Sequence, residues 1–138
     1  MAKRSRKQAP PQRLILDAGA VIALARADVR ARAALSAALE ADAEISIPAV
    51  IVAETVRGVA ADAPVNRVVK AVGEVDVADE QVGRVAGRLL GAAGSSSTVD
   101  ALVVATAITA GGAVVLTGDP DDLGALASDN AEVVIESL

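Results

Sequence analysis

The sequence contains no cysteine, no histidine and no aromatic residue in 138 positions. Without cysteine and histidine, the chain cannot form disulfides, a thiolate nucleophile, a serine–histidine–aspartate arrangement, or a zinc site built on sulfur or imidazole ligands. Any catalytic chemistry must therefore use carboxylates, hydroxyls, arginine or lysine. The core must consist of Ala, Val, Leu and Ile, whose small or branched side chains suit tight packing of helices on a sheet.

Long apolar segments are also lacking. No uninterrupted apolar stretch approaches the roughly 20 residues that span a bilayer, and the N-terminus lacks the apolar centre of a secretory signal. We therefore expect a cytoplasmic protein that does not associate with membranes. With 53% hydrophobic residues, a chain of 138 residues is sized for a single domain with one core.

The formal charge of −5 is unevenly distributed. Five of the 13 basic residues fall within the first 13 positions, and the rest of the chain holds 8 basic and 18 acidic residues. We expect residues 1–12 to form a basic, flexible tail and residues 13–138 to form the folded domain. Two interpretations of the tail stay open: a solubilising extension, or an arm that contacts nucleic-acid phosphates.

Short apolar strands alternate with helical segments in the rest of the chain. We predict strands over residues 14–16, 45–47, 74–77, 113–117 and 132–137. We predict helices over residues 18–27, 29–43, 48–58, 66–73, 79–94 and 98–110, and a short helix after a turn at residues 118–123, with Asp28 as an N-cap and Pro48 in a first turn. Such alternation is typical of a parallel sheet covered on both faces. The predicted fold is α/β, a three-layer α/β/α sandwich with a central, mostly parallel five-stranded sheet.

Four acidic residues fall at the predicted carboxyl edge of this sheet. Asp17 ends the first strand, Asp119 lies two residues beyond the fourth strand, and Asp100 opens the helix that leads into the fourth strand. Glu54 lies about two turns inside the helix after the second strand. If the first and fourth strands are neighbours, these carboxylates converge where α/β sheets commonly bind ligands.

Carboxylates crowded in a partly buried site repel one another, so they need a counter-charge to remain ionised. Divalent cations supply this charge, and a ligand set of oxygen atoms alone favours Mg²⁺ or Mn²⁺ over Zn²⁺ or Cu²⁺. Mg²⁺ commonly takes one or two carboxylates and keeps several waters, which leaves positions for phosphate oxygens and an attacking water. The pattern therefore indicates a site for phosphodiester hydrolysis.

Three of the four acids also have a purely structural interpretation. Asp17 could cap the turn after the first strand, and Asp100 could interact with its helix N-terminus. Asp119, Asp121 and Asp122 could form an ordinary turn, and Asp122 could take the place of Asp119 in a metal site. The occurrence of acids at all of these edge positions together favours the metal site.

Four segments resemble the signature motifs of PIN domains and, more narrowly, those of VapC-type toxin ribonucleases of bacterial toxin–antitoxin pairs. They are LILDAGA from Leu14, VAETVRG ending at Gly58, TVDALVVATA from Thr98 and VVLTGDPDDL from Val114. The motifs follow the order and spacing of the family and cover roughly residues 13–138.

The resemblance implies a function as well as a PIN-like fold. It assigns Mg²⁺ or Mn²⁺ to the acidic cluster of Asp17, Glu54, Asp100 and Asp119. It assigns the orientation of the site to Thr117. It further implies an endoribonuclease that hydrolyses RNA with a metal-activated water, forms a homodimer and is silenced by a small antitoxin. The segment 29–43 could contribute the surface that the antitoxin covers.

Position 18 departs from the family pattern, because it holds Ala18 where Ser, Thr or Asn is common. The alternative function is therefore a catalytically weak or inactive PIN-like module that binds RNA or an antitoxin. Other α/β classes fit less well. A signalling receiver needs a lysine beyond its last strand, but Lys70 is the only lysine after the tail. A phosphotransferase with an aspartate nucleophile usually has a second acid two residues after the first, but that position is Gly19 here. A dinucleotide-binding domain is poorly supported, because no GxGxxG motif follows the first strand.

Overall fold

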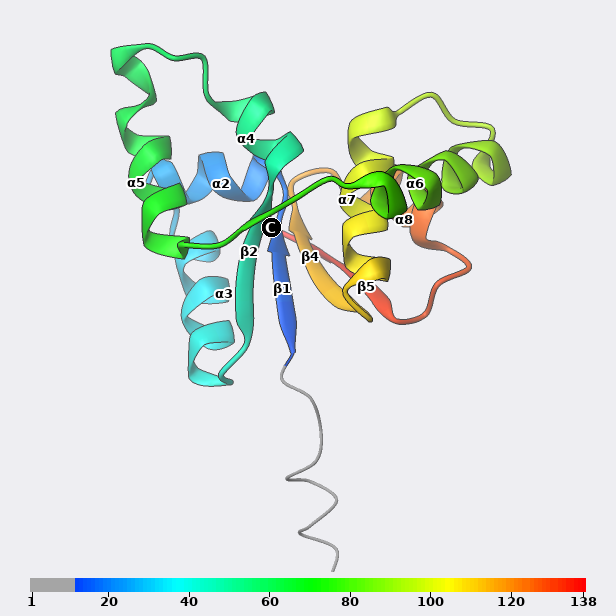
Figure 1. Cartoon of the computed structure of the whole chain (residues 1–138). Helices are drawn as coiled ribbons and strands as arrows, with labels where there is room; N and C mark the ends of the chain where they lie inside the picture. The colour runs from blue at the N-terminus through cyan, green and yellow to red at the C-terminus, as the bar shows by residue number, and fades with distance from the viewer. Residues whose placement is uncertain (1–11) are drawn as a thin grey trace, which may run out of the picture.

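The computed structural model describes residues 12–138 as a parallel sheet between two groups of helices (Figure 1). The strands are β1 (Arg13–Leu16), β2 (Glu44–Pro48), β3 (Val75–Asp76), β4 (Ala113–Thr117) and β5 (Val133–Ser137). The helices are α2 (Ala18–Ala25), α3 (Val29–Glu40), α4 (Ala49–Thr55), the short 3-10 helix η1 (Ala60–Asp62), α5 (Ala63–Val72), α6 (Glu80–Ala93), α7 (Thr98–Thr109) and α8 (Pro120–Ala127). The tail predicted over residues 1–12 lies outside the described residues, apart from Gln12.

The five strands have the order β3-β2-β1-β4-β5, and every neighbouring pair is parallel. Helices α2, α3 and α5 lie on one side of the sheet and α6, α7 and α8 on the other (Figure 1). The predicted three-layer α/β/α fold is therefore confirmed, with a sheet that is wholly parallel. The chain moves outward from β1 to β3 and then returns to start again at β4, so the switch point lies between β1 and β4.

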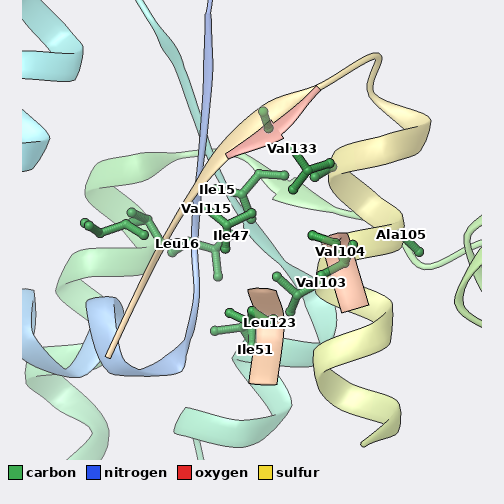
Figure 2. Packing of buried hydrophobic residues seen from close by; sticks show 14 of the residues in the cluster. Ile15, Leu16, Ile47, Ile51, Val103, Val104, Ala105, Val115, Leu123 and Val133 are labelled. Atoms are coloured by element: carbon green, nitrogen blue, oxygen red, sulfur yellow. The ribbon is translucent and has the colours of Figure 1, made fainter. Parts of the chain in front are cut away.

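The core is built from aliphatic side chains on both faces of the central strands. Figure 2 shows Ile15 and Val115 from the strands near Val103 and Val104 of α7. Helix α7 is buried around most of its circumference, which explains why its sequence is apolar on all sides. Within residues 12–138, no single helix has both the length and the hydropathy to cross a membrane. The pair α6 and α7 meets these two criteria only jointly, with a bend of 119° between the helices.

The helix predicted over residues 48–58 is shorter in the structure. It is α4, which begins after Pro48 and ends at Thr55, where Val56 turns to extended backbone. The amides of residues 57–59 bind the Asp62 carboxylate instead of helix carbonyls, which stops the helix. Glu54 therefore lies in the last turn of α4, and the prediction that the helix continues to Gly58 was wrong.

Other predicted boundaries shift by a few residues. Asp28 caps α3 as predicted, since its Oδ1 accepts a hydrogen bond from the Ala31 amide at 3.0 Å. That helix ends at Glu40 rather than at residue 43, because the chain turns through Asp42 with a φ of 58°. Helix α5 begins at Ala63, earlier than predicted, with a proline in its first turn.

Candidate active site

The carboxyl ends of β1 and β4 lie side by side at the switch point. The two strands are paired, with Leu16 opposite Leu116. The pairing continues into the next residue, because the Asp17 amide donates a hydrogen bond to the Leu116 carbonyl at 3.0 Å. The condition on which convergence of the four acids depends, that the first and fourth strands are neighbours, is therefore met.

Thr117, the last residue of β4, links Asp17 to Asp119. Its hydroxyl donates a hydrogen bond to Asp17 Oδ2 at 2.7 Å and accepts one from the Asp119 amide at 2.9 Å. Thr117 is fully buried and Asp17 is 8% exposed, so water competes little for this charge-assisted bond. Asp17 also makes no side-chain capping bond to α2. Thr117 thus holds the Asp17 carboxylate at the carboxyl edge of the sheet, and this carboxylate does not cap α2.

The start of α2 and the turn after β4 approach each other closely at Gly19 and Gly118. A Cβ atom at Gly19 would lie 3.0 Å from the backbone nitrogen of Gly118 and 3.2 Å from its Cα. A side chain at position 19 would therefore push the turn after β4 away from the start of α2. The sequence reasoning missed this role of Gly19. The available signal was a glycine within two residues of an acid in both motifs, DAG and TGD.

Asp100 lies in the first turn of α7. Burial raises its pKa above the ordinary value, and the negative charges of Asp17, Asp122, Asp119 and Glu54 raise it further, in that order. Because repulsion between charges weakens with distance, the shift places these carboxylates in one region of the molecule. The four charges with the largest effects on the pKa of Asp100 are all negative.

Asp119 lies beside Asp122. It occupies the N-cap position of α8 but makes no capping bond with its side chain. The charge of Asp122 is the main cause that raises the pKa of Asp119, followed by burial, a hydrogen bond between the two side chains, and the charges of Asp121 and Asp17. Asp122 is therefore a fifth acid of the cluster, adjacent to the residue for which it was considered a substitute.

The chemistry of this donor set fits a hard divalent cation. All of its ligand atoms are carboxylate oxygens, and the ion pairs within residues 12–138 involve Arg13 and Arg84 but no acid of the cluster. Among the same residues, no three carboxylates are close enough together, as they stand, to ligate one ion. Mg²⁺ commonly takes only one or two carboxylates directly and completes its shell with water, so the spacing is compatible with it.

One known family matches the sequence, and several solved structures share the fold. Residues 14–127 match the PIN domain family. A chain of the VapBC2 complex of Rickettsia felis, solved with a DNA fragment from its promoter, has a TM-score of 0.71 at 14% identity, covering 91% of this chain and 98% of that one. A chain of VapBC-5 from Mycobacterium tuberculosis has a TM-score of 0.61 at 22% identity, covering 93% and 100%. A toxin–antitoxin complex from Klebsiella pneumoniae gives 0.67 at 17% identity, covering 88% and 95%. No curated protein sequence matches the chain.

Proposed function

Since the chain belongs to the PIN domain family, whose members are generally nucleases that use divalent metals, we propose that it is an Mg²⁺- or Mn²⁺-dependent endoribonuclease. We further propose that it is the toxin of a type II toxin–antitoxin pair. The carboxylates that would hold the cation are those of Asp17, Glu54, Asp100 and Asp119, with Asp122 beside them. The observation that carries the proposal is the hydrogen-bonded chain from Asp17 through Thr117 to Asp119, at the edge of a cluster without a basic partner.

The residues of the site hold and orient the reacting groups. When bound, a divalent cation would lower the pKa of water and stabilise negative charge on the phosphate oxygens. The bond from Thr117 keeps the Asp17 carboxylate in one orientation before any ligand arrives. Because the chain has no histidine, the proton released from water passes to a carboxylate of the cluster or to solvent. The methyl side chain of Ala18 offers no polar contact to a phosphate.

The nuclease proposal is tested by cleavage of single-stranded and structured RNA in Mg²⁺, Mn²⁺ or EDTA. We expect cleavage with either metal and none in EDTA. Asp17→Asn should lower the rate by at least about a hundredfold, because it removes the carboxylate that Thr117 orients. Asp28→Asn is the matched control, since it neutralises a carboxylate that caps α3. RNA that stays intact under all conditions, but is bound by the protein, would favour the inactive binding module that Ala18 suggests.

The proposed antitoxin has a fitting surface in a groove between α3 and α5, with a volume of about 670 Å³. Its apolar lining includes Leu24, Leu35, Leu39, Val68 and Val72. Arg32 and Arg67 also line it, and neither forms an ion pair within residues 12–138. A partner helix or strand with apolar residues between acidic ones would complement this groove. Similarity to chains of toxin–antitoxin complexes supports such a partner, and a homodimer of the toxin belongs to the same proposal.

A synthetic peptide tests the groove. A peptide with leucines at helical spacing, flanked by glutamates, should bind the protein, and added salt should weaken binding because charge pairs contribute to it. Arg32→Glu should reduce the affinity by about tenfold or more, since it replaces attraction with repulsion. Arg88→Glu, on α6, is the control. Equal binding by both variants would argue against this groove.

A further inference from the structure

One buried carboxylate organises the turn that follows α4. Asp62 is 6% exposed, and its Oδ2 accepts three backbone hydrogen bonds. The donors are the amides of Arg57 at 2.9 Å, Gly58 at 2.7 Å and Val59 at 3.0 Å. These amides, Val59 first, lower the pKa of Asp62 below its ordinary value. Asp62 is therefore held as an anion, and three consecutive residues are oriented around one oxygen atom.

The end of α4 depends on this turn. The helix has seven residues, too few to be stable alone, and it ends in an extended Val56 instead of a left-handed glycine. In its last turn the Ala53 carbonyl accepts a hydrogen bond from Arg57 Nη1 at 2.8 Å, and the same Nη1 donates to Val56 O, just beyond the helix, at 3.2 Å. The same Arg57 gives its amide to Asp62. The carboxylate thus fixes the residue whose guanidinium closes the helix.

Glu54 lies in that last turn, one residue before the end of α4. Its side chain is exposed, so packing does not fix it. Its charge nevertheless reaches Asp100 across the cluster. The turn therefore sets where the backbone of Glu54 lies, on a helix that packs against α7.

We propose that Asp62 is a positioning residue: by holding the turn 57–59, it fixes the last turn of α4, and with it the backbone of Glu54, against α7. The role of Glu54 as a metal ligand rests on the proposed function, whereas the control of the helix end does not. Asp62 touches neither substrate nor metal in this arrangement. It acts through the amide and guanidinium of Arg57.

The test compares three variants of the full chain. Asp62→Ala removes the acceptor, and Asp62→Asn keeps one neutral oxygen in the same place. Asp28→Ala is the matched control, because Asp28 is also a carboxylate that accepts a backbone amide, at the start of α3. The first measurement is amide exchange by NMR, without metal, at Val56, whose N–H binds Val52 O at 2.9 Å. The second measurement is the affinity for Mn²⁺ by calorimetry.

We expect Asp62→Ala to accelerate exchange at Val56 by about tenfold beyond any change in global unfolding, and to weaken Mn²⁺ binding by about 10- to 100-fold. In Asp62→Asn, the exchange rate at Val56 and the affinity for Mn²⁺ should both lie closer to the wild-type values than in Asp62→Ala. Asp28→Ala should lower the melting temperature without changing either one. The proposal is overturned if Asp62→Ala retains the exchange rate and the Mn²⁺ affinity of the wild type, or if Asp28→Ala loses as much.

Two further outcomes are separable. If the wild type neither binds Mn²⁺ nor cleaves RNA, the proposed function is wrong, and exchange at Val56 alone decides the role of Asp62. If Asp62→Ala does not fold, Arg57→Met replaces it, since this variant removes the second support of the helix end. Loss of a positive charge by itself would strengthen cation binding, so a weaker affinity for Mn²⁺ in Arg57→Met reports the displaced helix end. An unchanged or stronger affinity would overturn the proposal.

Discussion

Two groups of acidic residues lie on this sheet, and they differ in whether a basic side chain balances them. The first group surrounds Arg13, whose guanidinium lies 3.2, 3.2 and 3.8 Å from carboxylate oxygens of Glu44, Glu74 and Asp76. The second group is the cluster at the carboxyl edge, which has no ion pair with any basic residue in the described part of the chain. Balanced acids hold strands together, whereas unbalanced acids lower stability and are useful only if a ligand compensates them.

The balanced group also shows how a buried polar side chain is accommodated. Ser46 of β2 is fully buried, and its hydroxyl donates a hydrogen bond to Asp76 Oδ2 at 2.6 Å. Arg13 reaches the same hydroxyl at 3.4 Å, so the network runs from β1 across β2 to β3. Arg13 counted as part of the basic N-terminal segment in the sequence, but its side chain belongs to the sheet.

The largest expected difference between the two groups is the response to a divalent cation. At about 100 times its dissociation constant, Mn²⁺ should raise the free energy of unfolding by about 2.7 kcal/mol. Circular dichroism during denaturant unfolding measures this gain, which suits a chain without tryptophan. Asp17→Asn should lose most of the gain, and Glu44→Gln should keep it. An equal gain in both variants would mean that the cation binds elsewhere.

Removal of the Arg13 guanidinium should leave the acids of the balanced group without a counter-charge. Arg13→Met should lower the free energy of unfolding by about 2 kcal/mol, because it leaves the partly buried Asp76 without its counter-charge. The affinity for Mn²⁺ at the other group should not change. Arg84→Met is the control, because its exposed pair with Glu80 on α6 is worth about 0.5 kcal/mol or less. Similar losses in the two variants would refute a special role for the Arg13 network.

The stability and the metal affinity of the carboxyl edge should depend on the close backbone contact between Gly19 and Gly118 more than on ion pairs. Gly19→Ala should lower the free energy of unfolding by about 1 kcal/mol and weaken Mn²⁺ binding, because its Cβ meets the backbone of Gly118. Gly83→Ala on α6 should instead raise stability by about 0.5 to 1 kcal/mol, since a Cβ there meets no atom within 4 Å. Stabilisation by Gly19→Ala with intact metal binding would show that the start of α2 and the turn after β4 can move apart without harm to the site.

The smallest expected effect is a gain in stability from removing one unbalanced charge. At pH 7 and without divalent cations, Asp100→Asn should raise the free energy of unfolding by about 0.5 kcal/mol, because the solvent screens part of the repulsion. The same variant should lose RNA cleavage. Glu74→Gln, in the balanced group, should lower stability slightly or leave it unchanged.

The pH dependence of that gain has a defined sign. The folded protein raises the pKa of Asp100 above 3.8, so its charged form is disfavoured relative to the unfolded chain. Stability is therefore lost as the pH rises from 3.8 through the raised pKa, and the loss is complete above it. The advantage of Asp100→Asn should accordingly shrink as the pH falls towards about 4, measured by unfolding of both proteins at each pH. An advantage that grows on acidification would contradict the assigned repulsion.

The sequence was sufficient to predict the layers, the strand alternation and the acids at the edge. Asp17 and Thr117 lie at the points where apolar runs stop, and such points mark strand ends whatever the tertiary structure. The early end of α4 was not predictable in this way, because AVIVAETVRG has unbroken helical spacing. Its end depends on Asp62, which lies outside that segment, and contacts of this kind override local propensity. The approach of Gly19 to Gly118 likewise depends on the strand order.

The hydrogen bond between Thr117 and Asp17 joins residues 100 positions apart. A ribosome releases the chain from its N-terminus, so β1 is made long before β4 can pair with it. The four acids of the cluster cannot come together until about residue 119 has left the ribosome. During most of its translation the nascent chain therefore carries its acids without an assembled site.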